Sequence, residues 1–393
     1  MPHHRPPALG AALLALAACA GAATAQQRVT LGKPDAELAE PFTNVRSVRE
    51  LPSGKVLVSD QQDKVVQLVD LAAGTAVKVG REGQGPGEYS FPGVLLGLPD
   101  GTTLLHDLLN RRFLVIGQDG KPGAILDLPR PPQSANGGDG PPLPLAGITD
   151  VRGADQQGRI YFQGSPFSAP NQPPLDSVPV LRWDRVRPAF DTVGYVRMPA
   201  GNAVATARGG NVSVRIGGGK VFTPTELWSV AGDGRIARVM PDPYRVVWMS
   251  GPRQVSPGPV QPYTPIRVTE ADKELVRETR RKTRPMIVAI GPGGRAAPPP
   301  NARIPEPEFE ETMPPFAGQT AVQVAPEGEV WVLRTRPAGD KVPTYDVFDR
   351  TGTLVKKVSL NPDSRVVGFG KGTVYVARTD EDDLQYLQRY RRP

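Results

Sequence analysis

The chain has 393 residues and a formal net charge of +7, from 47 basic and 40 acidic side chains. Both signs are abundant, and the only dense basic run is Arg277 to Arg284, so we expect no nucleic-acid partner, which would need a broader basic face. Hydrophobic residues make up 39%, a globular composition, while 45 Pro and 43 Gly indicate many turns between short strands.

The N-terminal segment has the features of an export signal. Arg5 precedes "ALGAALLALAACAGAATAQ", an apolar stretch of roughly sixteen residues, shorter than the roughly twenty that a membrane-spanning helix needs. This predicts a signal peptide over residues 1–25, with Ala23-Thr24-Ala25 as the cleavage site. Alternatively, Leu16-Ala17-Ala18-Cys19 resembles a bacterial lipobox, in which Cys19 would be lipidated. We expect a periplasmic or secreted protein, or a lipoprotein anchored through Cys19, with no transmembrane segment.

A repeated unit follows the signal segment. Each copy has an apolar strand, a turn that ends in Gly, a second strand, and then a third and a fourth strand. The best copies are "VRSVRELPSGKVLVSD", "GVLLGLPDGTTLLHD", "ITDVRGADQQGRIYFQG", "ELWSVAGDGRIARVM", "TAVQVAPEGEVWVLR" and "SRVVGFGKGTVYVAR". They align on Gly54, Gly101, Gly158, Gly234, Gly328 and Gly372. A glycine at each of these positions can adopt the positive φ that a tight hairpin turn requires.

Four strands in each of six units predict a six-bladed all-β propeller, with four-stranded antiparallel blades, over residues 27–393. An isolated blade cannot bury both of its faces, whereas six blades in a ring can. The last unit lacks a fourth strand, while "QRVTLG", after the signal segment, is a strand without a blade. Pairing the two would close the ring and remove two exposed strand edges.

One copy is specific enough to carry a resemblance. The segment from Gly80 to Gly120, "GREGQGPGEYSFPGVLLGLPDGTTLLHDLLNRRFLVIGQDG", resembles the repeat of six-bladed propellers of the NHL-repeat and TolB-like group, particularly bacterial exported ones. The resemblance implies the propeller fold across Val45 to Tyr390, and much less about activity.

The glycine-rich stretch "VGREGQGPGEYSFPG", Val79 to Gly93, invites comparison with a phosphate-binding loop. Such a loop leads from a strand into a helix whose N–H groups hold the anion. Here Gly93 leads directly into a strand, and the Lys-Ser/Thr pair of a P-loop is missing. We therefore interpret the stretch as a junction between two blades.

Residues 259–316 interrupt the repeat between units four and five. Within them, "TEADKELVRETRRKT" predicts a helix with Thr269 as its N-cap, Asp272 completing a capping box and Pro285 ending it. The remainder is rich in Pro and predicts a linker. The helix is expected to be a solvated element on the propeller rim; alternatively, it docks a partner through Arg277, Arg280, Arg281 and Arg284.

The sequence limits the chemistry that the protein could perform. Cys19 is the only cysteine, and removal of the signal segment leaves His106 as the only histidine. Disulfides, thiolate chemistry and multi-histidine metal sites are therefore excluded. A Ser-His-Asp triad would need His106, whose neighbour Asp107 points to the opposite face of the same strand, so we interpret His106 as a packing residue and expect no catalytic residue.

The sixth residue after each aligned glycine marks the end of the second strand, and the six positions are predicted to ring one mouth of the propeller. They are Asp60, Asp107, Gly164, Met240, Arg334 and Arg378. One interpretation is a polar ligand-binding mouth, in which Arg334 and Arg378 anchor a carboxylate and Arg111 and Arg112 lie on the same side. The other is structural: Asp60 and Asp107 cap their own turns, and Asp60 forms an ion pair with Arg378.

Two classes of function remain. The first is an exported binding scaffold, for a peptide, a protein partner or a cell-envelope ligand, without a cofactor and expected to be a monomer. The second is an enzyme. The propeller architecture resembles that of gluconolactonase-like and paraoxonase-like proteins, and this resemblance implies a Ca²⁺-dependent lactonase, hydrolase or lyase. Asp60, Asp107 and Asn110 offer suitable oxygens, but Gly164 and Met240 leave the set short of the six to eight that Ca²⁺ takes. We favour the binding scaffold.

Overall fold

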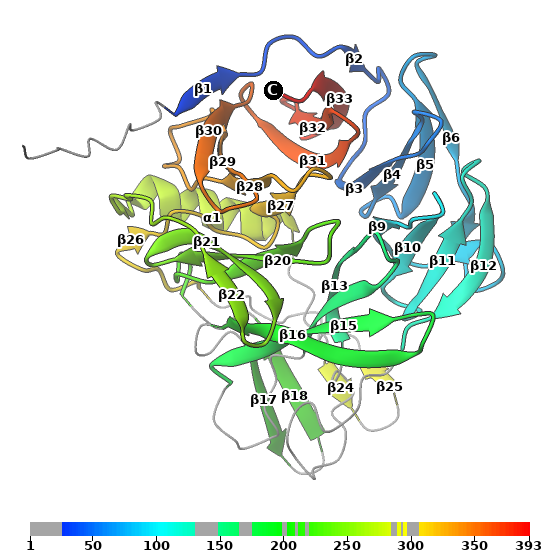
Figure 1. Cartoon of the computed structure of the whole chain (residues 1–393), viewed down its shortest axis with the longest axis horizontal. Coiled ribbons are helices and arrows are strands. Elements are labelled where there is room, and N and C mark those ends of the chain that lie inside the picture. Colours follow the sequence, from blue (N-terminus) through cyan, green and yellow to red (C-terminus); the bar gives the residue numbers. More distant parts are fainter. Residues whose placement is uncertain are drawn as a thin grey trace, which may run out of the picture.

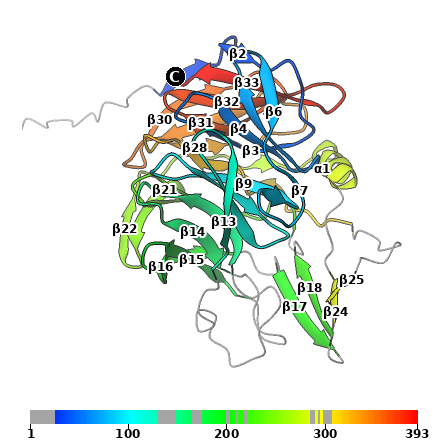
Figure 2. The same ribbon diagram turned by 90° about the vertical axis from the view of Figure 1, so that its right-hand side faces the viewer.

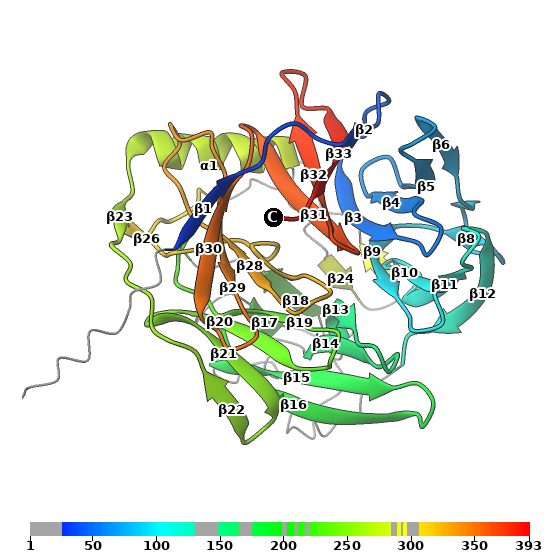
Figure 3. The ribbon, with the colours of Figure 1, turned by 45° about the horizontal axis from the view of Figure 1, so that its top comes forward.

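The computed structural model describes residues 26–129, 148–164, 175–198, 203–208, 211–216, 220–283, 289–291, 294–296 and 306–393. The signal segment with Cys19, as well as Arg284 and Pro285, lies outside these residues. Six antiparallel sheets surround a common axis, which confirms the all-β propeller with six four-stranded blades (Figures 1 and 3).

The blades follow one another along the chain, each from its inner to its outer strand. Blade one contains β3 (Val45–Glu50), β4 (Val56–Asp60), β5 (Val65–Asp70) and β6 (Thr75–Lys78). Blade two contains β9 (Pro92–Gly97), β10 (Thr103–Asp107), β11 (Arg112–Ile116) and β12 (Pro122–Asp127). Blade three contains β13 (Ile148–Ala154), β14 (Ile160–Gly164), β15 (Ser177–Asp184) and β16 (Ala189–Arg197).

The second half of the ring repeats the order. Blade four contains β19 (Leu227–Val230), β20 (Ile236–Pro241), β21 (Tyr244–Gly251) and β22 (Gln254–Pro257). Blade five contains β27 (Val322–Val324), β28 (Val330–Leu333), β29 (Thr344–Phe348) and β30 (Leu354–Ser359). Blade six contains β31 (Ser364–Gly370), β32 (Thr373–Thr379) and β33 (Gln385–Arg391), with β2 (Ala36–Glu37) as its fourth strand.

The turn glycines behave as the repeat predicts. All six aligned glycines have φ between 69° and 90°, a region that costs other residues steric strain. Each turn joins an inner strand to the second strand of its blade. In blade one, for example, the Gly54 N–H donates to the Leu51 carbonyl over 2.9 Å.

The N-terminus closes the ring, but with different residues from those predicted. The predicted segment "QRVTLG" contains β1 (Gln27–Thr30), which pairs in parallel with β30 and so extends blade five. The closing strand is β2, which pairs with β33. Leu38 and Phe42, which flank this pairing, are buried between blades six and one. We call residues 35–42, which contain β2, the latch. Burial of Leu38 and Phe42 favours this segment as the closing strand, although the β propensity of "QRVTLG" is higher.

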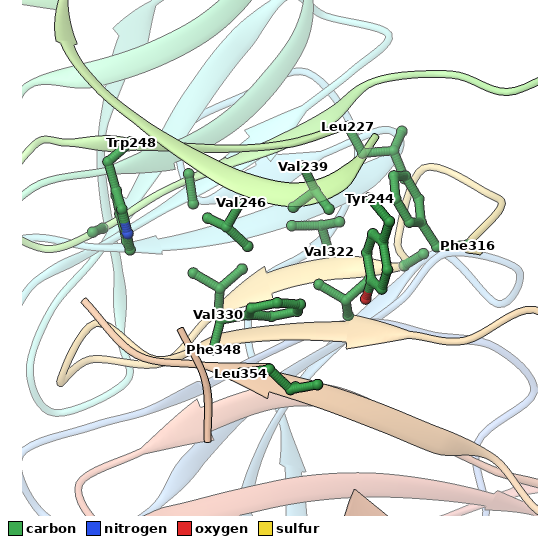
Figure 4. Close-up of a cluster of buried hydrophobic side chains, with 14 residues drawn as sticks. Leu227, Val239, Tyr244, Val246, Trp248, Phe316, Val322, Val330, Phe348 and Leu354 are labelled. Carbon is green, nitrogen blue, oxygen red and sulfur yellow. The ribbon is translucent and has the colours of Figure 1, made fainter. Parts of the chain in front are cut away.

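Hydrophobic clusters fill the spaces between neighbouring blades. Figure 4 shows the cluster between blades four and five, where Tyr244 packs against Phe316 and Phe348 with ring centroids 5.9 and 5.8 Å apart. Equivalent clusters lie between the other blades, so each blade depends on its neighbours for burial of its faces.

Because every inner strand begins at the same end of the ring, the connections between blades also lie there. We call this end the connection face. One connection contains the glycine-rich stretch, where β7 (Arg81–Glu82) and β8 (Glu88–Tyr89) pair before β9 begins. The stretch is thus a blade junction, as predicted.

Two longer connections leave the connection face. The first carries β17 (Ala203–Arg208) and β18 (Asn211–Ile216). The second, between blades four and five, carries β23 (Ile266–Arg267), α1 (Glu270–Thr283), β24 (Ala289–Gly291), β25 (Gly294–Ala296) and β26 (Thr312–Met313). β24 pairs with β18, which joins the two connections in a small sheet that the sequence did not predict. Figure 2 shows this sheet and α1 toward the same side of the ring.

The helix has the predicted capping box. The Thr269 N–H donates to the Asp272 carboxylate over 2.7 Å. The other oxygen of Asp272 accepts the Ala338 N–H of blade five, also over 2.7 Å. Asp272 is buried, whereas Leu275 of the expected apolar stripe is half exposed. A polar cap therefore attaches α1 to the propeller.

Candidate functional site

The six predicted rim positions lie at the connection face, at the ends of second strands. Asp60 is paired with Val45 and Arg378 with Ser364, and both partners are the first residues of inner strands. The strand register therefore places these positions where the sequence analysis expected them. The direction of their side chains decides whether they meet.

Asp60 and Asp107 are buried, and their carboxylates accept hydrogen bonds from backbone N–H groups. One oxygen of Asp60 accepts the N–H groups of Thr43 and Asn44, over 2.7 and 2.9 Å, and the other accepts those of Gln62 and Asp63. Asp60 thus caps its own turn and also ties the N-terminal segment to blade one.

Asp107 has the corresponding role in blade two. It accepts the N–H groups of Ser90 and Phe91, together with the side chains of Asn110 and Arg112, over 2.7 and 3.3 Å. These donors surround its carboxylate, so its oxygens are occupied by N–H groups.

Arg112 belongs to the same junction, whereas Arg111 does not. The Arg112 guanidinium donates to the backbone carbonyls of Gln84 and Glu88, over 2.7 and 2.9 Å, in addition to its ion pair with Asp107. It therefore holds the glycine-rich junction against blade two. Arg111 is an exposed turn residue with φ of 53°.

Arg334 takes part in a buried network between blades four and five. Its guanidinium lies 2.6 Å from the Asp346 carboxylate, which also accepts the Tyr244 hydroxyl over 2.9 Å. The guanidinium lies 5.1 and 5.0 Å from the ring centroids of Tyr244 and Tyr263. Burial lowers the pKa of Arg334, but Asp346 and Tyr244 more than offset this and leave the pKa raised.

Arg378 contacts the N-terminal latch. Its guanidinium lies 3.5 Å from the Glu37 carboxylate of β2 and 4.6 Å from the ring centroid of Tyr386. The expected ion pair between Asp60 and Arg378 is therefore replaced, because Glu37 brings a carboxylate to Arg378 while backbone N–H groups occupy Asp60. In the described residues, the predicted rim residues do not form one binding cluster.

A different set of polar side chains gathers around the propeller axis, close to the connection face. They stand on the inner strands, except for one on the second strand of blade two. We call the set the axial cluster; its members are Arg46, His106, Asp150, Arg152 and Arg365.

Arg365 and Arg152 each have a partner in their own blade and another in the next blade. Arg365 donates to the Val45 carbonyl over 2.6 Å and to the Gln385 side chain over 2.9 Å, from blade six toward blade one. Arg152 lies 2.8 Å from the Asp150 carboxylate, with its guanidinium 5.7 Å from the ring centroid of Trp228 in blade four.

Arg46 differs from its neighbours because its guanidinium has no hydrogen bond or ion pair with any described residue. Burial lowers the pKa of Arg46; Asp150 raises it in part, and Arg152 lowers it further. Burial also lowers the pKa of Arg365, and Arg46 adds to that effect. These cations are thus close enough to destabilise one another.

His106 lies beside this group as a neutral imidazole. Burial lowers its pKa to about 4; the negative charge of Asp107 opposes the shift, and the positive charge of Arg46 adds to it. The ring packs against Phe113, with centroids 5.5 Å apart. His106 therefore contributes polarity but no charge near neutral pH.

The sequence analysis missed the axial cluster because it followed the second strands. A signal was present: Arg46 and Arg365 are each the second residue of an inner strand, and Asp150 is the third. Charged residues at such positions are unexpected where neighbouring blades crowd together.

The basic residues proposed for partner docking on α1 are mostly neutralised. Arg277 forms ion pairs with Glu274 and Glu306, and its guanidinium lies 5.8 Å from the ring centroid of Phe309. Arg281 forms an ion pair with Glu274. Arg280 is partly buried.

Two adjoining cavities, of about 640 and 610 Å³, lie beside α1 and blade four. Both are lined by Pro265, Glu310, Glu311 and Thr312. Their lining residues include no member of the axial cluster, so these cavities are separate from it.

No protein-family model and no curated protein matches this sequence. Solved structures with similar chains include a predicted exported protein of Bacteroides fragilis (11% identity, 94% of this chain and 95% of the other, TM-score 0.48). Others are a virginiamycin B lyase of Staphylococcus aureus (12%, 89% and 97%, 0.38) and a gluconolactonase of Xanthomonas campestris (11%, 93% and 95%, 0.38). The assignment of the propeller fold rests on the sheet topology of this chain itself.

No helix among the described segments combines the length and the apolar character needed to cross a membrane.

Proposed function

We propose that the protein is an exported binding propeller, of the NHL-repeat and TolB-like type, that holds a ligand at the axial cluster. The ligand is a polar group of a peptide, of a protein partner or of a cell-envelope molecule. Periplasmic or secreted location follows from the export signal. The proposed binding residues differ from those that the sequence analysis predicted, because all members of the axial cluster except His106 stand on inner strands.

One observation supports this proposal above the others. Buried charges in proteins are normally paired, because desolvation of an unpaired ion is costly. Arg46 is partly buried, enough to lower its pKa, and is unpaired among the described residues, beside two further guanidinium groups. A ligand with acceptor oxygens would supply the missing partner.

The proposed function can be tested by retention of ligands from a cell-envelope extract. Purified, immobilised wild-type protein, Arg46→Met and Arg253→Met are each incubated with the whole extract and washed, and the retained small molecules, peptides and proteins are identified by mass spectrometry. Arg253 is an exposed turn residue at the end of blade four opposite the connection face, so its variant is the matched control.

We expect a compound that the wild type and Arg253→Met retain in stoichiometric amounts and that Arg46→Met does not. Equal retention by Arg46→Met, or no retention by the wild type, would contradict a ligand site at the axial cluster.

The alternative, a Ca²⁺-dependent lactonase, hydrolase or lyase, finds less support in the side chains. Asp60 and Asp107 accept N–H groups, whereas a calcium ligand would need its lone pairs for the metal. In the described part of the chain, no group of three or more His, Cys, Asp or Glu side chains is arranged to hold a metal ion. These residues do not fit calcium.

A further inference from the structure

The charges of the axial cluster do not balance. Asp150 is its only carboxylate and lies 2.8 Å from Arg152. Arg46 and Arg365 then remain, and neither forms an ion pair with a described residue. The partners of Arg365, a carbonyl and an amide oxygen, are neutral. The cluster therefore carries two positive charges without a counter-charge.

The positions of these two groups are compatible with one shared ligand. Arg365 donates to the carbonyl of Val45, the residue that precedes Arg46, and the guanidinium group of Arg46 is close enough to lower the pKa of Arg365 further, after burial. An anion between them would remove this repulsion and provide acceptors for Arg46.

We propose that the axial cluster binds the carboxylate group of an organic acid, with Arg46 as its bidentate partner. This inference rests on the proposed function and names the chemical class of its ligand. The planar fork of a guanidinium group matches the two oxygens of a carboxylate, with charge-assisted hydrogen bonds that are stronger than neutral ones.

A carboxylate fits better than a phosphate group for two reasons. Asp150 stays in the cluster and would repel a dianion more strongly than a monoanion. The desolvation penalty also rises steeply with ionic charge, and Arg46 is partly buried, so that burial lowers its pKa.

The test measures binding of defined probes by calorimetry and by the shift in melting temperature, at constant ionic strength in chloride. The probes are N-acetylalanine, propionate and succinate, each with its neutral amide, and inorganic phosphate. The proteins are wild type, Arg46→Met, Arg46→Lys and the control Arg253→Met.

We expect at least one carboxylate to bind the wild type and Arg253→Met and to raise their melting temperatures. Arg46→Met should weaken this binding by about tenfold or more. Arg46→Lys, which keeps the charge without the fork, should bind with intermediate affinity.

Several outcomes would overturn the inference: no carboxylate binds, the amides bind equally well, phosphate binds most tightly, or Arg46→Met binds as the wild type does. If amides or phosphate bind and Arg46→Met abolishes that binding, the ligand class is wrong while the proposed function stands. If Arg46→Met still retains the compound from the envelope extract, the proposed function itself is wrong.

Discussion

His106 shows how the environment of a single residue sets its charge. Burial lowers the pKa of this imidazole to about 4, from an ordinary value near 6.5. In the unfolded chain the imidazole therefore binds a proton at a higher pH than in the fold. Between these two values the unfolded state holds more protons, so stability falls as the pH falls.

This effect is predicted to be measurable with His106→Gln. Between pH 7.5 and pH 5 the wild type should lose about 2 kcal/mol of unfolding free energy through this residue, a loss that the variant lacks. Urea unfolding of both proteins at the two pH values measures the difference. Parallel pH dependences of the two proteins would contradict a neutral, buried His106.

Asp60 and Asp107 show a second principle at the residue scale. Each ends a second strand, and each accepts N–H groups from the chain segment that enters its own blade. A buried carboxylate with several such donors is well stabilised. Their position at the rim is therefore explained by the folding of the junctions, without any ligand.

At the scale of elements, the two N-terminal strands make different contributions. β1 is largely exposed along the edge of blade five, although Leu31 beyond it is buried. β2 is short, but its surroundings bury Leu38 and Phe42, and ion pairs of Asp35 with Arg389 and of Glu37 with Arg378 flank it. We therefore expect the latch to contribute more to the free energy of unfolding than β1 does.

Two truncations test this difference. A chain that starts at Lys33 loses β1 and Leu31, and its unfolding free energy should fall by about 2 kcal/mol, the burial of one leucine. A chain that starts at Asn44 also loses Leu38 and Phe42, and the decrease should be at least about 5 kcal/mol.

The second truncation also exposes the edge of β33, so that it should unfold or associate through that edge. Melting temperatures and size-exclusion chromatography distinguish the two chains. Equal melting temperatures would mean that β2 is not the latch.

At the scale of the whole molecule, one end of the ring carries all the connections between blades. The axial cluster lies near this end, and the two long connections leave from it. The insertion between blades four and five starts and ends at one point of the ring, because Arg267 of β23 is paired with Thr312 of β26. The ring itself does not require the segment between them.

Replacement of residues 268–311 by a short Asn-Gly turn tests this independence. The closing pair stays intact. The replacement removes the pairing of β24 with β18 and of Phe309 with Val221, which lie in the connection between blades three and four. From the ring itself it removes the hydrogen bond between Ala338 and Asp272, so unfolding of the ring should remain cooperative, with a decrease of about 1–2 kcal/mol. Circular dichroism and thermal melting check the result. Loss of cooperative unfolding would show that the insertion is part of the ring.

Local features of the fold were predictable from the sequence. The six turn glycines and the capping box of α1 depend on a few adjacent residues, and the structure confirms both. The partners of Arg334 and Arg378 were not predictable, because Asp346 and Glu37 reach them from other strands. The sheet that joins β18 to β24 was missed for the same reason, since its strands come from two separate connections.

The sequence by itself determined the number of blades, the positions of their turns and the place of the helix, because a repeat of glycines and apolar strands is written in consecutive residues. Only the tertiary structure decided which N-terminal residues close the ring and which polar side chains meet at its axis. The physical reason is that burial and charge pairing act between blades, across distances along the chain that no local pattern records.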